Sequence, residues 1–99
     1  MSICNFSATE TMRLLRQRQI SSVEVVQAYL ARIDKFNPSL NAFVTLDPQG
    51  ALEAARKADE HPSSGALHGL PVAIKDLSYT AGMRTTCGSL TLKDYVPQE

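Results

Sequence analysis

A lysine–aspartate pair and a hydroxyl-rich segment are the parts of this sequence best suited to chemistry. Lys75 and Asp76 end the apolar run 70–74, and the segment 85–89 follows with two threonines and a serine. A lysine at the end of a buried segment can act as a base when it is neutral. It can equally place its ammonium in water while its stem packs on apolar neighbours. Residue type and spacing alone favour the second, structural role.

The other reactive side chains give weaker signals. Cys4 and Cys87 are far apart and share no Cys-x-x-Cys or Cys/His spacing, so we expect two free thiols. His61 and His68 lie in a stretch rich in Pro, Ser and Gly and have no partner at metal-ligand spacing. We therefore expect no metal and no cofactor.

Charge and hydropathy exclude two classes of partner. Ten basic and ten acidic residues cancel, and neither sign forms a run, so the sequence has no electrostatic footprint for nucleic acid. The N-terminus lacks a basic region followed by an apolar stretch, and no segment is long and apolar enough to span a bilayer. We expect a cytoplasmic protein that binds no nucleic acid and no membrane.

Two helices are predicted in the first third of the chain. The Ser-x-x-Glu patterns that begin at Ser7 and Ser21 are typical of capping boxes. The first predicts a helix that ends near Gln19, and the second predicts a helix over about 21–36 with Val26, Leu30 and Ile33 on its apolar face. The pair 37–38, Asn-Pro, should end the second helix. Two antiparallel helices joined by a tight turn follow.

The middle of the chain alternates between strand and helix patterns. The β-branched and aromatic run 42–46 predicts a strand, and Asp47-Pro48 predicts the start of an alanine-rich helix through 58. The composition of 61–65 predicts a loop, and that of 70–75 predicts a second, buried strand. The predicted class is α/β, with a helical hairpin followed by strand, helix and strand.

The segment 67–89 as a whole resembles the amidase signature family. It reads Leu-His-Gly-Leu-Pro-Val-Ala-Ile-Lys-Asp over 67–76 and continues with Gly82 and Thr-Thr-Cys-Gly-Ser over 85–89. The segment 41–43, Asn-Ala-Phe, and the segment 95–97, Tyr-Val-Pro, are also similar. The resemblance extends over nearly all of the 99 residues and implies the N-terminal portion of an α/β/α sandwich with a mixed sheet. Residues 1–99 would then be an incomplete part of a single amidase domain.

The resemblance implies a hydrolase that cleaves a carboxylic amide through a Ser-cisSer-Lys triad, with a small-molecule amide as substrate. Lys75 matches the catalytic lysine, which must be neutral to act as a base, and burial in an apolar strand would favour that form. The lysine would take a proton from the nucleophilic serine through a bridging serine. The resemblance implies that both serines come from a glycine- and serine-rich segment expected beyond Glu99. Ser63-Ser64-Gly65 precedes the lysine and has the composition of a linker. The 99-residue chain alone is therefore expected to be inactive.

Several assignments stay open at this level. Thr85, Thr86 and Ser89 match the family's threonine loop and could cap a turn or support the active site, and Asp76 could bind that loop or face solvent. An alternative within the family is the amidase subunit of the tRNA-dependent amidotransferase, with partner subunits and aminoacyl-tRNA. Leu77 stands where that subunit usually has asparagine, which favours a general amidase. A non-catalytic helical adaptor, or a remnant, is the alternative outside enzymes.

Overall fold

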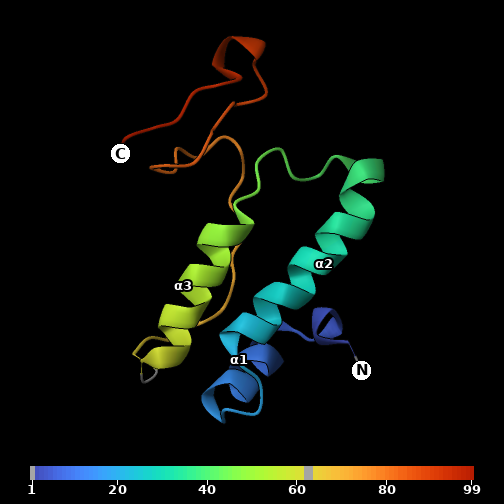
Figure 1. Cartoon of the computed structure of the whole chain (residues 1–99), viewed down its shortest axis with the longest axis vertical. Helices are drawn as coiled ribbons and strands as arrows, with labels where there is room; N and C mark the ends of the chain where they lie inside the picture. Colours follow the sequence, from blue (N-terminus) through green and yellow to red (C-terminus); the bar gives the residue numbers. More distant parts are fainter. Residues whose placement is uncertain (1, 62–63) are drawn as a thin grey trace.

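Three α-helices followed by a long irregular segment make up the described part of the chain (Figure 1). The computed structural model describes residues 2–61 and 64–99. Helix α1 spans Ala8–Arg16, α2 spans Ser22–Leu40 and α3 spans Pro48–Glu60. Short 3-10 turns lie at Ile3–Asn5 (η1) and Leu90–Leu92 (η2). Pro62 and Ser63, part of the predicted loop 61–65 and of the predicted linker, lie outside the described residues.

Local capping sets the starts of all three helices, as the sequence predicts. The Ser7 side chain accepts a hydrogen bond from a backbone N–H in the first turn of α1. Ser21 and Glu24 form a complete capping box on α2, with N···O distances of 3.0 and 3.2 Å. Asp47 caps α3, and Pro48 occupies its first turn. Each cap satisfies backbone donors that have no partner inside the helix.

The predicted end of the second helix is wrong. Helix α2 continues through Pro38 to Leu40 and ends at Asn41, which adopts a left-handed conformation with φ 52°. The Asn37 side chain helps to hold this end, because its carboxamide accepts from the N–H of Phe43 at 2.8 Å and donates to its carbonyl at 3.1 Å. A proline inside a helix loses one hydrogen bond, and these two bonds to the following loop offset that loss. Helix α1 ends at Arg16, before the predicted Gln19.

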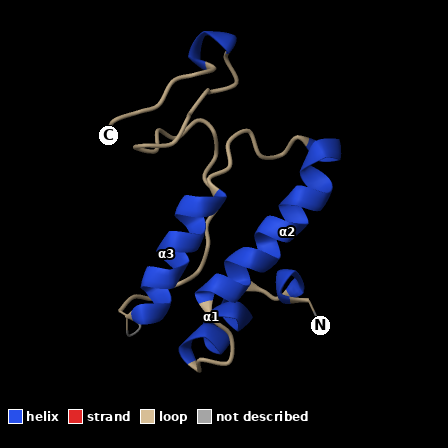
Figure 2. Cartoon of the chain, in the orientation of Figure 1, coloured by secondary structure: helices blue, strands red, loops and turns tan. Residues whose placement is uncertain are grey.

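Helices α2 and α3 lie side by side and run in opposite directions, as Figure 2 shows. The main antiparallel pair is therefore α2 with α3, and not the first two helices. The core between the helices is small. Val25 is 0% exposed and lies at its centre. The other buried apolar side chains of the helices are Met12, Leu14, Val26 and Ala55.

The predicted strands are absent from the described residues, so the prediction of an α/β fold with a mixed sheet is wrong for this chain. The backbone N–H groups of 72–75 donate to no backbone carbonyl in the described part, and Val72 and Ile74 are 70% and 58% exposed. The segment 42–46 is likewise a loop. A strand exists only through a ladder of hydrogen bonds to a neighbouring strand. These two segments have the composition of strands, but they do not pair with each other.

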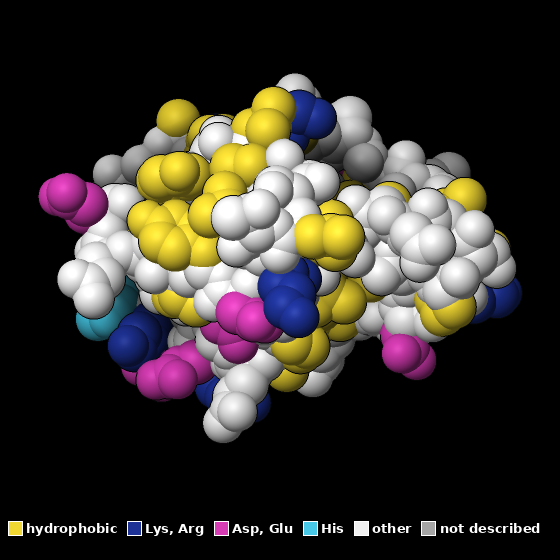
Figure 3. All heavy atoms as spheres, turned by 90° about the horizontal axis from the view of Figure 1, so that it is seen from above, with side chains coloured by type: hydrophobic (Ala, Val, Ile, Leu, Met, Phe, Trp, Pro, Cys, Tyr) yellow, Lys and Arg dark blue, Asp and Glu magenta, His cyan; other side chains and the backbone are white. Residues whose placement is uncertain are grey.

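The C-terminal segment 76–99 lies beyond the N-terminal end of α3 and extends the molecule (Figure 1). The chain measures 45 × 31 × 21 Å, with a radius of gyration of 14.7 Å. A compact chain of this length has a radius of about 13 Å. Viewed onto this end, hydrophobic side chains form several exposed groups (Figure 3). None of the helices in residues 2–61 and 64–99 has both the length and the apolar character to cross a membrane.

Candidate functional site

Lys75 lies in the exposed segment that follows Leu70, and its side chain is exposed. It lines one edge of an open, largely apolar groove of about 1180 Å³. The wall of the groove is made mainly by α2, by the loop 42–47 and by 70–76, and residues 83–85 add to it. The predicted apolar strand environment of Lys75 is therefore not formed by the described residues. The amine is accessible from the groove and from solvent.

Asp76, the next residue, is bound to the threonine loop, residues 85–89, by three hydrogen bonds that together form the Asp76 clasp. Its Oδ1 accepts from the backbone N–H of Thr86 at 2.8 Å, and its Oδ2 accepts from the Thr86 hydroxyl. Its backbone carbonyl accepts from the N–H of Cys87 at 2.9 Å. Cys87 and Gly88 both have left-handed backbones, with φ of 52° and 71°, and this turn directs the Cys87 N–H toward Asp76. Of the two roles left open for Asp76, the structure shows binding to the loop.

The Asp76 carboxyl is electrostatically tuned by this clasp. The hydrogen bond from the Thr86 hydroxyl, with a further contribution from the Thr86 backbone N–H, lowers the pKa of Asp76 below its ordinary value of 3.8. Partial desolvation opposes this shift, and the Gly88 N–H and the positive charge of Arg84 add to it. Donors that bind the ionised form stabilise it, so Asp76 is a carboxylate at neutral pH.

The hydroxyls of the threonine loop point into the loop itself. Thr85 is 3% exposed, and its Oγ1 donates to the carbonyl of Met83 at 3.1 Å. Thr86 is 5% exposed, and its hydroxyl accepts from the N–H of Gly88 at 3.2 Å while it donates to Asp76. Ser89 caps the turn η2. These hydroxyls hold the loop together, which is the turn-capping role considered for them.

Arg84 connects this loop to two distant segments and was not singled out by the sequence. Its guanidinium donates to the carbonyl of Val44 at 3.2 Å and to the hydroxyl of Thr45 at 3.3 Å, and it also donates to the carbonyl of Lys93. One side chain therefore joins the loop after α2 to two parts of the C-terminal segment. No local pattern marks such a residue, because Val44 and Thr45 lie 40 and 39 positions away in the chain.

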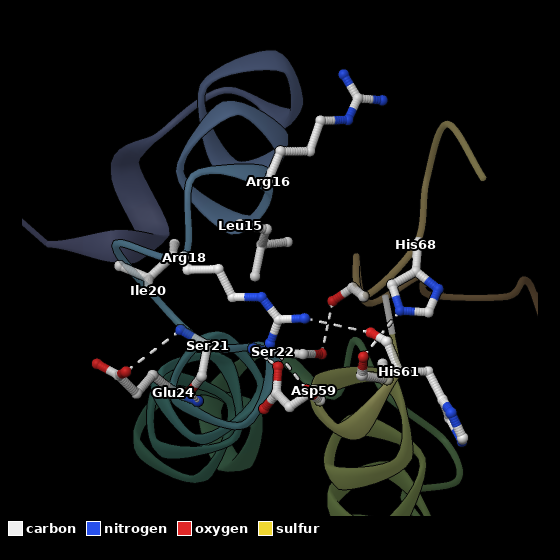
Figure 4. Close-up of a pocket in the computed structure, with 12 residues that line it drawn as sticks. Leu15, Arg16, Arg18, Ile20, Ser21, Ser22, Glu24, Asp59, His61 and His68 are labelled. Carbon is white, nitrogen blue, oxygen red and sulfur yellow. Dashed lines mark hydrogen bonds between the residues drawn. The ribbon is translucent and has the colours of Figure 1, made fainter. Parts of the chain in front are cut away.

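A second polar cluster, drawn in Figure 4, joins α2 and α3 to the turn that follows α1. Asp59 of α3 accepts from the N–H groups of Ser22 and Val23 at 2.7 and 3.1 Å, and so caps α2 from outside. The Ser22 hydroxyl donates to the carbonyl of Gly69 at 2.7 Å. The guanidinium of Arg18 reaches across to the carbonyl of Asp59 at 2.9 Å. Arg18, Ser22, Asp59 and Gly69 line a cavity of about 390 Å³.

The histidines and cysteines have structural surroundings. His61 and His68 line the same cavity, and Nε2 of His68 lies 2.8 Å from the carbonyl oxygen of Ala58. Cys4 and Cys87 are free thiols, as predicted. In the part of the chain that the structure describes, no group of three His, Cys, Asp or Glu side chains is arranged to hold a metal ion.

Comparison with known proteins gives a consistent result. The family model for Amidase matches residues 24–99. The A subunit of glutamyl-tRNA(Gln) amidotransferase from Azoarcus sp. (strain BH72) is 50% identical over 95 residues, which is 93% of this chain and 20% of the relative. The corresponding protein of Marinomonas sp. (strain MWYL1) is 51% identical over 86 residues, or 84% of this chain and 18% of the relative.

A third relative, the same amidotransferase component from Geobacter metallireducens, is 41% identical over 98% of this chain and 21% of its own length. The chain thus spans about a fifth of the length of the curated relatives that it matches. No solved structure matches it. The family match includes Lys75, Asp76 and the threonine loop, and it extends over about three quarters of the residues, so the chain belongs to the amidase signature family.

Proposed function

We propose that residues 1–99 are the N-terminal part of an amidase domain that hydrolyses a carboxylic amide, with Lys75 as the base of a Ser-cisSer-Lys triad. A lysine can accept a proton only as the neutral amine, because the ammonium has no lone pair. The neutral amine would take the proton of the nucleophilic serine through the bridging serine, and the nucleophile would attack the amide carbonyl. The C–N bond would then break, and the leaving ammonia or amine would take up the abstracted proton. Water would hydrolyse the remaining acyl-serine ester, which releases the carboxylic acid and regenerates the serine.

The observation that carries this proposal is the placement of Lys75 beside a structured loop. Asp76 fastens the loop 85–88 directly to the residue after the lysine. The side chain of Lys75 remains exposed at the edge of the apolar groove, where a substrate and further catalytic groups have access to it. The structural alternative is an ammonium that simply reaches water, and an exposed Lys75 without a salt bridge among the described residues fits that role as well. The activity of Lys75 variants separates the two roles.

The names of the relatives favour one member of the family. All three relatives described above are A subunits of glutamyl-tRNA(Gln) amidotransferase. We propose that the amide cleaved is that of an ammonia donor such as glutamine, and that the protein acts with partner subunits on aminoacyl-tRNA. This outweighs the argument from Leu77 for a general amidase. The prediction of no nucleic-acid partner would then apply only to the surface of these 99 residues, where the charges balance.

The test is Lys75-dependent amide hydrolysis by the protein as its own gene encodes it. Release of ammonia from glutamine, and hydrolysis of a simple aryl amide, are measured for the wild type, Lys75→Ala and Lys75→Arg. Lys93→Ala is the matched control, because Lys93 is also an exposed lysine and its hydrogen bonds in the described part of the chain are made by its backbone. Both Lys75 variants should lose at least about 100-fold in kcat, since a general base contributes about 10²–10⁴-fold and arginine is always charged.

The two substrates separate the candidate functions. Lys75-dependent release of ammonia from glutamine supports the amidotransferase component, and hydrolysis of the aryl amide alone supports a general amidase. Turnover that survives Lys75→Ala would refute the triad. A protein with no turnover of either substrate would give preference to the helical adaptor, in which the two N-terminal helices bind a partner.

A further inference from the structure

The peptide on the C-terminal side of Lys75 is held from three directions. The Lys75 carbonyl accepts from the N–H of Ser78 at 3.0 Å, which closes a turn. The Asp76 carbonyl accepts from the N–H of Cys87, and the Asp76 carboxylate accepts both bonds from Thr86. A carboxylate that accepts two donors from one residue fixes distance and orientation together.

The loop that carries these donors is itself anchored. The N–H of Thr85 donates to the carbonyl of Tyr95 at 2.9 Å, and the N–H of Gly82 donates to the carbonyl of Pro97 at 2.9 Å. Pro97 is fully buried, and the rings of Tyr79 and Tyr95 meet edge to face with centroids 5.5 Å apart. The loop is therefore held in place and can fix the position of a neighbouring residue.

The segment on the N-terminal side of Lys75 is not held in this way. The segment 71–74 has no backbone hydrogen bond in the described part of the chain, and its apolar side chains are largely exposed. Among the described residues, the backbone of Lys75 is therefore held only from its C-terminal side. The hydrogen bonds that hold it are the one from Ser78 to the Lys75 carbonyl and those that Asp76 accepts. Among these bonds, only those to the carboxylate depend on a side chain and can be removed by substitution.

We propose that Asp76 is a positioning residue for Lys75, acting through its two hydrogen bonds to Thr86. The carboxylate locks the threonine loop to the lysine and keeps the amine at one place on the edge of the groove. This inference rests on the proposed function, because it assumes that Lys75 is the catalytic base. A displacement of a catalytic group by about 1 Å costs up to about 100-fold in rate.

The experiment compares variants of the clasp in the same protein and with the same two amides. Asp76→Ala removes both acceptors and should lower kcat by about 10- to 100-fold while KM stays within about twofold, because Asp76 orients the base and does not bind substrate. Asp76→Asn keeps one acceptor oxygen, and Thr86→Val removes only the hydroxyl, so each should give a smaller loss. Thr86→Ser restores the hydroxyl and should retain activity within about threefold.

A double-variant cycle distinguishes positioning through this pair from general damage. If the hydroxyl acts only through the carboxylate, Asp76→Asn combined with Thr86→Val should lose no more activity than the worse single variant. Asp94→Asn is the matched control, an exposed aspartate in the same segment. The near-ultraviolet signal of Tyr79 and Tyr95 reports whether the segment remains folded.

Each outcome supports or overturns the inference. It is overturned if Asp76→Ala leaves kcat unchanged, if it raises KM at constant kcat, or if the double variant shows additive losses. If Asp76→Ala fails to fold, the cycle of Asp76→Asn and Thr86→Val decides. Turnover that requires Lys75 but is indifferent to Asp76 refutes only this inference. Turnover that survives Lys75→Ala refutes the proposed function instead.

Discussion

The carboxylate of Asp76 receives two hydrogen bonds from Thr86, one from its backbone N–H at 2.8 Å and one from its hydroxyl. The two residues are ten positions apart, and together they close the loop that follows Lys75. The same carboxylate is the group in this region whose pKa is clearly lowered. The contact between Asp76 and Thr86 therefore closes the loop and lowers the pKa of Asp76. It can be tested through enzyme activity and through the pH dependence of stability.

The stability of the C-terminal segment should depend on pH through Asp76. Because the folded-state pKa lies below the ordinary value of 3.8, the ionised carboxylate stabilises the fold above that value, and this contribution is lost as the pH falls through the lower folded-state pKa. The near-ultraviolet signal of the tyrosines, followed in an acid titration, should fall below pH 3.8 in the wild type. Asp76→Asn should show a weaker signal at neutral pH and a flatter acid titration. An identical titration in both proteins would contradict the assignment.

Truncation of the Val25 side chain should destabilise the small core. Val25→Ala removes two methyl groups at a fully buried position and should lower the free energy of unfolding by about 2 kcal/mol. Val72→Ala is the matched control at a position that is 70% exposed, and it should change stability by no more than about 0.5 kcal/mol. Urea denaturation followed by far-ultraviolet circular dichroism measures both. Equal effects would show that the core does not centre on Val25.

The capping box of α2 should contribute to stability. Ser21→Ala leaves the N–H of Glu24 without its acceptor and should cost about 1 kcal/mol in the free energy of unfolding. Ser39→Ala, in the last turn of the same helix, changes the same residue type at an exposed position that is no cap. It should be neutral within about 0.5 kcal/mol. A comparable loss in both variants, measured by denaturation, would count against the capping interpretation.

The hydrogen bonds between Asp59 of α3 and the start of α2 should contribute more to stability than the partly exposed position of Asp59 indicates. Asp59→Ala leaves the N–H groups of Ser22 and Val23 unpaired and should cost about 2 kcal/mol, whereas Asp59→Asn keeps an acceptor and should cost less. Asp34→Ala, on the exposed face of α2, is the control. Hydrogen exchange at the amides of Ser22 and Val23 should accelerate in Asp59→Ala. Unchanged exchange there would show that other groups protect this helix end.

Local chemistry explains why the helix starts could be predicted. Ser21 with Glu24, and Asp47 with Pro48, act on backbone groups within a few residues, so the sequence alone contains both partners of each interaction. The end of α2 was harder to predict, because Pro38 remains in the helix through bonds made by Asn37 to the following loop. The apolar face was partly right. Val26 is buried, but the centre of the core is Val25, and the side chains of Leu30 and Ile33 line the groove instead.

By itself the sequence determined the three helix starts and the identity of the family, since both reside in short contiguous patterns. Tertiary structure decided whether 42–46 and 70–75 become strands, because a strand requires hydrogen-bonding partners that composition does not supply. It also decided that Asp76 binds Thr86, that Arg84 joins Val44 to Lys93, and that Lys75 is exposed. These are contacts between residues distant in the chain, and only the folded backbone brings them together.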